Sequence, residues 1–440
     1  MRVVVAHPGT QHSLRLAVAL QKADRLAAYV TRMYWDAKRE PYRTLESLPV
    51  VGPRLAAQTV RRRHDELSPD LVVDESPTRE LLLYGLARAH LPTLRRRTML
   101  AMNRRFGRRV ADLARREADA LVTYDLAADD AFAALDGTGV RRILDLSHPH
   151  VQGHRILQEE AEREPAWAAT LRFPTSPDQI ESCRREERAA DRVIVASSFS
   201  RECMIRDGVP GERVVVVPYG VDLERFRPEP VRDLTRRPLR ALFVGQVGQR
   251  KGISYLLEAM RRLGSHPVEL TIAGEVMGSA PGLREACSER VHLAGRVAER
   301  ELARLFASAD VFVLPSLVEG FGLVLLEAMA AGLPILATPH SAAPDLVEEG
   351  GDGFVVPVRD PDAIAERLAL LASDPALLRR MKRAARAKAE LFPWSRYERA
   401  VVEATCGGWD QTAAAPSRVA EPGRSLRGSA HEPGVEHRVH

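Results

Sequence analysis

The feature that most constrains the fold is a regular alternation of apolar runs and helical patterns between residues 239 and 356. The apolar runs are LRALFVG, VELTIAG, VHLAG, ADVFVLPS, PILAT and GFVVPV. Between them, ISYLLEAMRRL, RELARLFAS and FGLVLLEAMAAG repeat apolar residues at helical spacing. Strands that alternate with helices form a parallel sheet covered on both faces. We therefore predict a doubly wound, Rossmann-like α/β domain over residues 239–390.

A less regular alternation runs through the first half of the chain. RVVVA at 2–6 predicts a buried strand, which the polar turn HPGTQHS and a helix from about Leu14 to Ala23 follow. Further strands are predicted at 120–124, 142–146, 192–196 and 213–218. The segment 32–118 is mostly helical in pattern and rich in arginine, and we interpret it as an elaboration. Residues 1–220 thus predict a second Rossmann-like domain, joined to the other by the turn-rich linker 221–238.

Past the second domain the pattern changes twice. A long helix is predicted from about Pro375 to Leu391, and FPWSRYERAVVEAT predicts another over 391–405. Residues 406–440 are rich in Gly, Pro, Ser and Ala and have no periodicity. Such a segment cannot bury enough apolar surface to offset its conformational entropy, so we predict a disordered tail.

Length and composition fit this organisation. A chain of 440 residues favours two domains, and 45% hydrophobic with 28% charged residues is typical of globular proteins. The longest apolar runs are too short to span a membrane, and Met1-Arg2 leads directly into a strand pattern without the cleavage region of a signal peptide. The four cysteines form no CxxC pair, which argues against a zinc knuckle or a disulfide framework. We expect a cytoplasmic protein.

The excess of basic residues is concentrated in one stretch of the chain. The chain has 64 basic and 59 acidic residues, a mild excess for a nucleic-acid binder. However, RRRTMLAMNRRFGRRVADLARR, at 95–116, holds nine arginines. This stretch is interpreted either as a solvated helical face or as a site for an anionic acceptor or for the charged surface of a membrane. Binding to nucleic acid is not expected.

Two glycine-containing loops follow predicted strands of the second domain. In FVGQVGQRKGISYLLEA, at 243–259, Gly245, Gly248 and Gly252 would let backbone N–H groups approach an anion at a helix N-terminus. Arg250 and Lys251 would add positive charge. The loop matches neither a Walker A nor a GxGxxG pattern, and a plain turn with solvated cations is the alternative.

The other loop lies in VLPSLVEGFGLVLLEA, at 313–328. Gly320 and Gly322 open a turn, and the amides from Phe321 to Leu323 should form a second anion site at a helix N-terminus. Glu319 would lie at the mouth of that turn. Glu327 lies in an otherwise apolar helical run, where a carboxylate is costly without a polar partner. A vicinal diol such as a ribose would supply one, whereas the alternative is a glutamate salt-bridged nearby or at the helix edge.

Taken in order, these stretches resemble a known family. FVGQVGQRKG, ELTIAGE, VHLAGRVAERELARLFASADVFVLPSLVEGFGLVLLEAMAAGLPILAT and the earlier VIVASSFSRECMIRDGVPGERVVVVPYGVDLERF resemble the family 4 retaining glycosyltransferases. Enzymes of this family have the two-domain GT-B fold. The resemblance covers roughly residues 190–405, where Glu319 and Glu327 form the family's E-x7-E pattern, and it is loose over 1–190.

The resemblance implies roles for the loop residues. Glu327 would bind the ribose of a sugar nucleotide, Lys251 and Arg250 the diphosphate, and Glu319 a donor-sugar hydroxyl near the reacting carbon. Gly245, Gly248 and the turn from Gly320 to Leu323 would complete the donor site.

Further positions are assigned by the same resemblance. Arg296 and Val297 stand where such enzymes contact the base, and the helix of FPWSRYERAVVEA would cross back to the first domain. Two positions depart from the family pattern. Gln246 stands where an arginine is common, so that either Arg250 replaces it or the phosphate is held less tightly. Tyr219 stands where asparagine is usual, at a site expected to be structural.

In the first domain the family often has a glycine-rich loop near the donor phosphates. The equivalent here is HPGTQHS, whose candidates are Gly9, Thr10, Gln11 and His12. A histidine commonly contacts the donor sugar or the acceptor, and LSHPHVQGH, at 146–154, supplies His148 and His150. We favour His148.

The histidines of LSHPHVQGH also have a metal interpretation, since H-x-H-x3-H can place three imidazoles around one ion. No fourth ligand is evident in the sequence, and GT-B enzymes generally work without metal, so we expect no metal and no cofactor. The single D-x-D, Asp360-Pro-Asp362, lies before a predicted helix and is interpreted as a cap.

The resemblance implies a glycosyltransferase of hexosyltransferase type that acts in polysaccharide or glycoconjugate biosynthesis. It would move a sugar from a UDP- or GDP-sugar to a saccharide, lipid-linked or small-molecule acceptor, with retention at the anomeric carbon. Its location would be cytoplasmic or peripheral at the inner membrane face. The alternatives are a GT-B sugar-nucleotide epimerase and a non-catalytic protein that binds nucleotide sugars.

Overall fold

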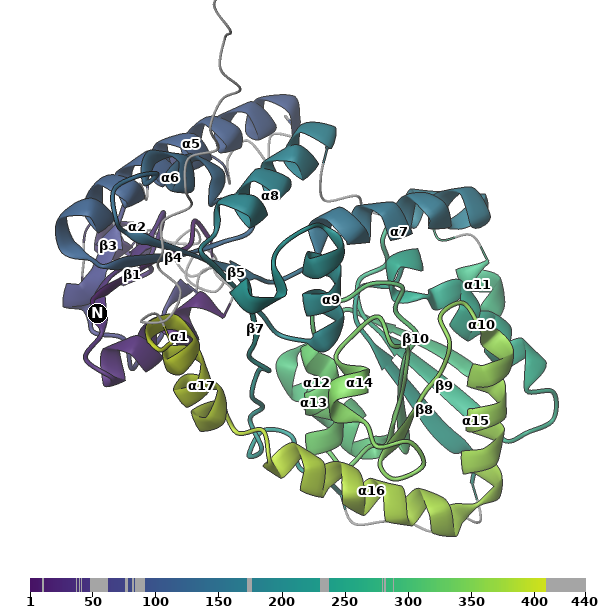
Figure 1. The fold of residues 1–440 in the computed structure, drawn as a ribbon. Coiled ribbons are helices and arrows are strands. Elements are labelled where there is room, and N and C mark those ends of the chain that lie inside the picture. Colours follow the sequence, from purple (N-terminus) through teal and green to yellow (C-terminus); the bar gives the residue numbers. More distant parts are fainter. Residues whose placement is uncertain are drawn as a thin grey trace, which may run out of the picture. The chain divides into compact units, whose positions relative to one another are not determined.

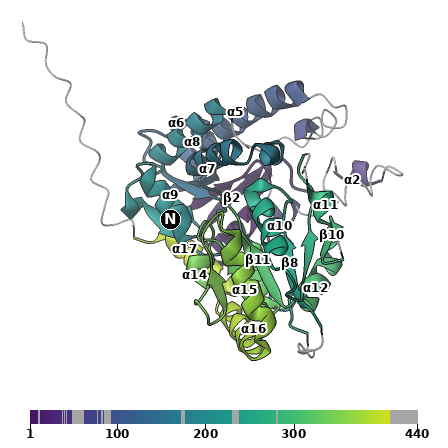
Figure 2. The ribbon, with the colours of Figure 1, turned by 90° about the vertical axis from the view of Figure 1, so that its right-hand side faces the viewer.

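The computed structural model describes residues 1–9, 12–36, 38, 40, 42–47, 62–75, 78–80, 83, 92–171, 176–229, 237–278, 280, 282–287 and 289–408. Residues 1–407 form one compact unit, which holds two β-sheets (Figures 1 and 2). From residue 409 onward, the tail that the sequence predicts to be disordered lies outside the described residues.

The N-terminal sheet has seven strands in the described part of the chain, all parallel, in the order β3-β2-β1-β4-β5-β6-β7. The strands are β1 Val3–Ala6, β2 Leu26–Thr31, β3 Val72–Asp74, β4 Ala120–Tyr124, β5 Arg141–Leu146, β6 Arg192–Val195 and β7 Val214–Val216. The strand order reverses direction between β1 and β4, and ligands of such sheets bind at the carboxyl ends of the strands beside this point.

The C-terminal sheet repeats this design with six strands in the described part, again parallel, in the order β10-β9-β8-β11-β12-β13. Its strands are β8 Leu239–Val244, β9 Val268–Ala273, β10 Val291–Gly295, β11 Val311–Leu314, β12 Ile335–Ala337 and β13 Gly353–Val355. Here the reversal lies between β8 and β11, so the loops after these two strands are placed to bind a ligand.

Helices cover both sheets. Those of the first half are α1 Ser13–Lys22, α2 Tyr42–Glu46, α5 Pro92–Glu117, α6 Asp129–Ala134, α7 His150–Arg163, α8 Pro177–Ala189 and α9 Ser198–Arg206. Those of the second half are α10 Ile253–Arg262, α11 Leu283–Ala286, α12 Glu299–Ser308, α13 Leu323–Ala330, α14 Ala343–Leu346, α15 Pro361–Ser373, α16 Pro375–Glu390 and α17 Trp394–Cys406. Short 3-10 turns are η2 Pro69–Leu71, η3 Pro165–Thr170, η4 Gly211–Arg213 and η5 Gln249–Lys251.

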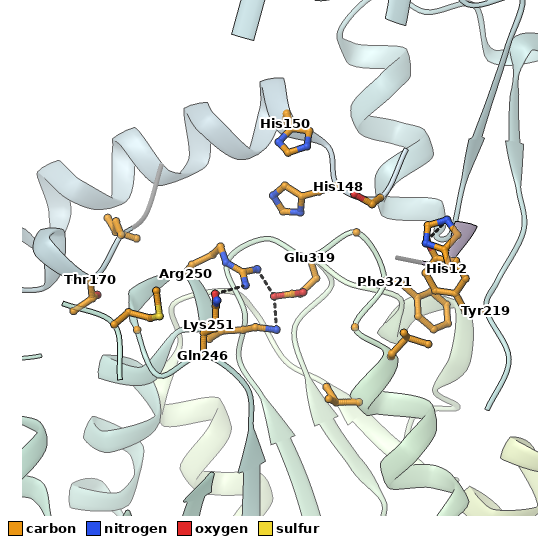
Figure 3. Close-up of a pocket in the computed structure, with 18 residues that line it drawn as sticks. His12, His148, His150, Thr170, Tyr219, Gln246, Arg250, Lys251, Glu319 and Phe321 are labelled. Carbon is orange, nitrogen blue, oxygen red and sulfur yellow. Dashed lines mark hydrogen bonds and ion pairs between the residues drawn. The ribbon is translucent and has the colours of Figure 1, made fainter. Parts of the chain in front are cut away.

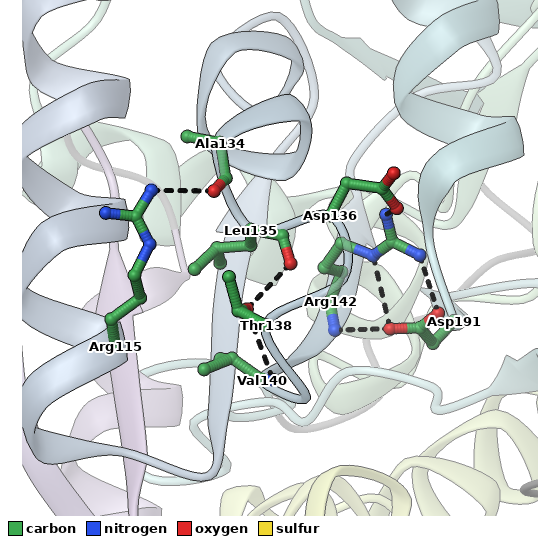
Figure 4. A network of polar contacts seen from close by, with 8 residues as sticks. All are labelled: Arg115, Ala134, Leu135, Asp136, Thr138, Val140, Arg142 and Asp191. Carbon is green, nitrogen blue, oxygen red and sulfur yellow. Dashed lines mark hydrogen bonds and ion pairs between the residues drawn. The ribbon is translucent and has the colours of Figure 1, made fainter.

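The two layers of helices on the N-terminal sheet come from different parts of the chain. In Figure 1, α5, α6 and α8 lie on one side of the sheet, and α1 lies on the other beside α17. Figure 4 shows polar contacts that join α5 to α6 and β5 to the residue before β6. Arg115 of α5 donates to the carbonyl of Ala134 at the end of α6, and Arg142 of β5 donates to both carboxylate oxygens of Asp191, just before β6.

Helix α17 returns from the C-terminal half to pack on α1, as the resemblance implies for the final helix. Glu398 of α17 forms ion pairs with Arg15 and Lys22 of α1. At the other end, the Arg192 guanidinium donates to the carbonyls of Ala404 and Gly407, which the helix leaves without an internal partner.

The predicted fold class, two Rossmann-like doubly wound α/β units, is confirmed. The exact domain and linker boundaries stay predictions. The strand β2 was not predicted, because LAAYVT follows α1 closely and its Leu and Ala continue a helical pattern. Helix and strand are separated here by Asp24, whose φ of 54° is left-handed and ends the helix. The strand β3 was missed because it is only three residues long.

No helix in the described ranges is both long and apolar enough to cross a membrane.

Candidate functional site

A cavity of about 1060 Å³ lies where the carboxyl ends of the two sheets meet (Figure 3). The lining residues come from loops after β5, β8, β9 and β11, from the start of α1 and α7, from the chain after η3 and β7, and from the start of α13. They are His12, Ser147, His148, His150, Thr170, Leu171, Tyr219, Gln246, Gly248, Arg250, Lys251, Met277, Glu319, Gly320, Phe321, Gly322, Leu323 and Val324.

The loop after β8 brings two cations into this cavity. Arg250 and Lys251 lie in η5, and Gly252, with φ of 70°, ends this turn and caps the N-terminus of α10. The backbone carbonyl of Arg250 accepts a hydrogen bond from the N–H of Leu317 at 2.9 Å, which joins this loop to the loop after β11. The cations are thereby held next to the second glycine turn.

Glu319 is the counter-ion of both cations. Its Oε1 lies 2.6 Å from Arg250 Nη1 and 2.6 Å from Lys251 Nζ (Figure 3). Burial alone would raise the pKa of Glu319, but the charges of Arg250 and Lys251 outweigh this and hold it at about 2. Burial lowers the pKa of Lys251, and Glu319 opposes that shift. One carboxylate therefore faces two cations, and the cluster keeps a net positive charge suited to an anionic ligand.

The second glycine turn places a helix N-terminus beside this cluster. A side chain at Gly320 would clash with the carbonyl oxygen of Ser147, so glycine allows the closest approach of this turn to the loop after β5. The carbonyl of Gly320 accepts hydrogen bonds from the hydroxyls of Ser197, at 2.6 Å, and Ser200, at 3.0 Å. Gly322, with φ of 85°, then caps α13, whose first residue Leu323 lines the cavity. The N-terminus of a helix favours an anion because its first N–H groups lack partners in a preceding turn; in α13 the N–H of Leu325 already donates to the carbonyl of Gly322, at 2.8 Å.

The opposite wall consists of histidines that buried carboxylates orient. His150 Nε2 lies 2.5 Å from Asp125 Oδ2, and Ser147 donates to the other oxygen of that carboxylate from its backbone N–H at 2.9 Å. His148 lies above Glu319 in Figure 3. Burial, followed by the charges of His150 and Arg250, lowers the pKa of His148 to about 3, so its imidazole is neutral at physiological pH.

His12 is held in the same way at the other end of the cavity. Its Nε2 lies 2.9 Å from Asp145 Oδ1, and its Nδ1 lies 3.1 Å from the hydroxyl of Tyr219. The Tyr219 ring packs edge-on against Phe321, with centroids 5.1 Å apart. Tyr219 was expected to be structural, and the structure places it both in this packing and in the cavity wall.

The structure brings together most, but not all, of the residues predicted for the site. The predicted residues that line the cavity are His12, His148, His150, Gly248, Arg250, Lys251, Glu319, Gly320, Phe321, Gly322 and Leu323. Gly245 lies at the end of β8, where a Cβ would be 3.3 Å from Lys251 Cε. Thr10 lies outside the described residues, and Gly9 lies in the loop after β1, without lining the cavity.

The predicted ribose and base contacts lie beyond the cavity lining. Glu327 is half-buried on α13, and within the described ranges no hydrogen bond or ion pair to its side-chain carboxylate is found. Burial raises its pKa to about 7, although Arg225 opposes that shift. Arg296 is exposed and Val297 half-buried in the loop after β10. The roles of these residues stay predictions.

Sequence reasoning did not single out Thr170, Leu171 or Met277 as site residues. Thr170 and Leu171 lie after α7, in WAATLRF, which carries no motif. The position of Met277 soon after β9 is the one signal that points to it, because loops after strands of a parallel sheet lie at the ligand-binding edge.

The metal interpretation of LSHPHVQGH gains no support. His150 pairs with Asp125, and no group of three or more His, Cys, Asp and Glu side chains arranged for a metal occurs in the parts of the chain that the structure describes. Asp360 is the N-cap of α15 and accepts from the N–H of Ala363, whereas Asp362 pairs with Arg262. The D-x-D is therefore a helix cap, as predicted.

Comparison with known proteins agrees with this geometry. Residues 230–388 match the family described as "Glycosyl transferases group 1". The chain is 38% identical over 230 residues to a D-inositol 3-phosphate glycosyltransferase of Streptomyces avermitilis, covering 47% of this chain and 49% of that protein. It is 33% identical over 270 residues to an MMP alpha-(1->4)-mannosyltransferase of Mycolicibacterium hassiacum, covering 59% and 65%. The matches thus span about half to two thirds of the length of these relatives.

Solved structures extend the likeness of fold to nearly the whole chain. Anabaena Alr3699/HepE in complex with UDP aligns with a TM-score of 0.58 at 18% identity, covering 92% of this chain and 99% of that one. Sucrose-phosphate synthase of Thermosynechococcus elongatus aligns with a TM-score of 0.59 at 20% identity, covering 92% and 98%. These likenesses confirm the GT-B fold, and the family match confirms the resemblance over the C-terminal half.

Proposed function

Since residues 230–388 belong to the glycosyl transferases group 1 family, we propose that the chain is a glycosyltransferase that uses a nucleoside-diphosphate sugar. The observation that carries the proposal is the pair of cations that share one carboxylate beside the N-terminus of α13. A diphosphate leaving group requires positive charge and N–H donors that are in place before the reaction, and this is where preorganised electrostatics contribute most.

In the proposed complex the diphosphate lies between η5 and the N-terminus of α13. Arg250 and Lys251 stabilise the charge that grows on the leaving phosphate, and Glu319 holds both cations and contacts a hydroxyl of the donor sugar. Glu327, which is half-buried and near neutral pH only partly ionised, accepts hydrogen bonds from the ribose. UDP and GDP are the proposed carriers.

The reaction proposed is transfer to an acceptor hydroxyl with retention at the anomeric carbon. The departing phosphate takes the proton of the acceptor hydroxyl, so the charges of Arg250 and Lys251 serve both the departure and the proton transfer, and no metal is assigned a role. Neutral His148 faces Glu319 and hydrogen-bonds the donor sugar or the acceptor.

The acceptor enters from the N-terminal side, where α5 offers a surface for a membrane-bound acceptor. Leu94 and Leu100 are 51% and 37% exposed, and Arg97, Arg104 and Arg108 are exposed along the same helix. Apolar and basic side chains on one exposed helix suit an anionic membrane. We therefore propose a cytoplasmic protein that associates peripherally with such a membrane, which sedimentation with vesicles of anionic and of neutral lipid would test.

Calorimetric titration with UDP, GDP, ADP, dTDP and CMP tests the donor site directly. We expect one nucleoside diphosphate to bind clearly more tightly than the others, and Glu327→Ala to weaken that binding. Product analysis with the matching sugar nucleotide, with and without acceptors, then separates a transferase from an epimerase, because an epimerase needs no acceptor. If no nucleotide binds the wild-type protein, the proposal is wrong.

A further inference from the structure

A segment from the first half of the chain contacts η5 of the second half, the turn that carries Arg250 and Lys251. The segment consists of α7 and η3, residues 150–170, and follows β5 of the N-terminal sheet. Its beginning supplies His150 to the cavity, and its end supplies Thr170. Between these two residues, the side chain of Glu160 is fully buried and has no exposed surface.

Glu160 contacts three separate elements of the C-terminal half. Its Oε1 accepts from Gln249 Nε2 at 2.6 Å, in η5, and from the hydroxyl of Tyr255 at 2.8 Å, in α10. Its Oε2 accepts from Arg359 Nε at 2.7 Å, just before α15. Both carboxylate oxygens therefore have donors, as a buried charge requires.

The contact with Gln249 reaches the donor site itself. Gln249 is fully buried, and it directly precedes Arg250 and Lys251 in the same turn. Its backbone N–H donates to Thr170 Oγ1 at 2.9 Å. The turn that presents both cations is thus fixed by two side chains, Glu160 and Thr170, from the segment 150–170.

The backbone around this contact leaves little room for the segment to shift. Gly278, with φ of 58°, lies so close to the carbonyl of Ala169 that a Cβ would clash with it. Arg359 has a φ of 65°, a left-handed conformation that is unfavourable for a residue with a side chain. A strained backbone persists only where its surroundings determine it, and the ion pair with Glu160 is such a constraint.

A buried ion pair such as Glu160–Arg359 usually contributes little to the free energy of unfolding. Desolvation of Glu160 and Arg359 offsets most of their attraction, and apolar residues of the same volume often do as well. The best-attested use of such a group is to fix one arrangement of the elements that it joins. Here the elements are α7, whose first residue is His150 of the histidine-lined side of the cavity, and η5, which carries Arg250 and Lys251.

We infer that Glu160 is a positioning residue for the diphosphate: through Gln249 it sets the turn of Arg250 and Lys251, and so makes donor affinity depend on the docking of segment 150–170. This rests on the proposed function, because it assumes that η5 binds the phosphates of a sugar nucleotide. It assigns to a residue outside the cavity lining a control over the strength of donor binding.

The experiment compares Glu160→Gln with Glu159→Gln in the full chain. Glu159 is the preceding residue on α7 and is exposed, so the two variants make the same change of charge on one helix. Calorimetry with UDP, GDP, ADP and dTDP first finds the diphosphate that binds the wild type. That diphosphate and the corresponding monophosphate are then titrated against both variants.

We expect Glu160→Gln to weaken diphosphate binding about tenfold or more. Monophosphate binding should weaken much less, so the ratio of the two affinities should fall in Glu160→Gln and not in Glu159→Gln. A merely structural role would lower the melting temperature and leave this ratio unchanged, and that result would overturn the inference. If the wild type binds no diphosphate, it is the proposed function that fails.

Thr170→Val provides a second arm in case Glu160→Gln does not fold. The substitution keeps the side-chain volume and every charge, but removes the acceptor of the Gln249 N–H. It should lower the same affinity ratio severalfold, since a buried N–H without an acceptor favours rearrangement of η5. An unchanged ratio in Thr170→Val would contradict the inference independently of Glu160.

Discussion

The two walls of the cavity use different chemistry. The C-terminal wall presents charge: Arg250 and Lys251 around Glu319, beside the N-terminus of α13. The N-terminal wall presents imidazoles, with His150 and His12 each held by a buried carboxylate. The first wall suits an anionic group whose charge grows during a reaction, whereas the second suits neutral hydroxyls that need only be oriented.

The two walls also differ in how the chain builds them. The charged wall is made by two contiguous loops, at 245–252 and 316–323, whose residues are neighbours in sequence. The histidine wall is assembled from distant pieces, since His12 meets Asp145 from 133 positions away and Tyr219 from 207. Local motifs can encode the first wall, but only the folded sheet creates the second.

The largest effect is expected from a substitution that removes a positive charge from the C-terminal wall. Lys251→Ala removes a buried cation from the proposed leaving-group site, so kcat should fall at least about 100-fold, the size seen when one stabilising group of a transition state is lost. Steady-state kinetics with the donor found by titration measure this. Lys251→Arg keeps the charge and serves as the conservative control, and it should retain more activity. Turnover close to that of the wild type in Lys251→Ala would show that charge is not what this wall contributes.

The next largest effect is expected from substitutions of His148, which test whether this residue of the N-terminal wall acts as a neutral imidazole. His148 has a pKa of about 3, because it is buried and lies near His150 and Arg250, and it is therefore uncharged between pH 5 and 8. His148→Ala should lower kcat about 10- to 100-fold. His148→Gln, which is neutral and polar, should recover part of that loss, whereas His148→Lys should not.

The pH dependence sharpens this test. Since His148 does not titrate between pH 5 and 8, the shape of the pH profile of kcat/KM should be the same in the wild type and in His148→Gln. A limb of the profile near pH 6 to 7 that the substitution removes would show that a charged imidazole takes part, and the contrast between the walls would fail.

The difference between the walls explains what could be predicted from the sequence. The two glycine loops that line the cavity were predicted with most of their lining residues, because Gly248, Arg250, Lys251 and Gly320 carry glycine and charge signals within short stretches. His148 was favoured by resemblance alone. Asp125 and Asp145, which orient the histidines, carry no local signal, since their partners lie on other strands.

The same reasoning applies to the fold and to Glu160. In the C-terminal sheet, the helices α10, α12 and α13 separate strands clearly, and the alternation could be followed to its end. In the N-terminal sheet β2 merges with the pattern of α1, and β3 is short. Glu160 resembles any other acidic residue of an amphipathic helix, and only the tertiary contacts with Gln249, Tyr255 and Arg359 distinguish it.

A third prediction concerns Glu327, a carboxylate of the C-terminal half outside the charged cluster. Burial raises its pKa from 4.5 to about 7. As pH rises from 4.5 to 7 the unfolded chain loses this proton before the folded one, so the folded state is increasingly disfavoured, and the cost is complete above about pH 7. Glu327→Gln should therefore stabilise the protein at pH 8, by at most about 3 kcal/mol at 1.36 kcal/mol per pH unit, and have little effect at pH 4.

Denaturant unfolding at the two pH values measures this stabilisation. The same substitution should weaken nucleotide binding about tenfold at pH 8, because the amide accepts the ribose hydrogen bonds less well than a carboxylate. Weaker binding together with higher stability is the signature of a carboxylate kept for a ligand. If Glu327→Gln lowers the stability at pH 8, then Glu327 has a structural partner.

The smallest effect is expected from Tyr219→Phe, because Tyr219 contacts both walls of the cavity through neutral atoms of its own side chain. The hydroxyl of Tyr219 lies 3.1 Å from His12 Nδ1, and its ring packs on Phe321 of the charged wall. The substitution keeps the packing and removes the hydrogen bond to His12, and one hydrogen bond is worth about 1 kcal/mol, or about fivefold. Turnover should fall by no more than that factor, and KM for the donor should hardly change, since no charge is lost. A loss of 100-fold or more would instead make the Tyr219 hydroxyl part of the chemistry, and the histidine wall would then do more than orient its ligand.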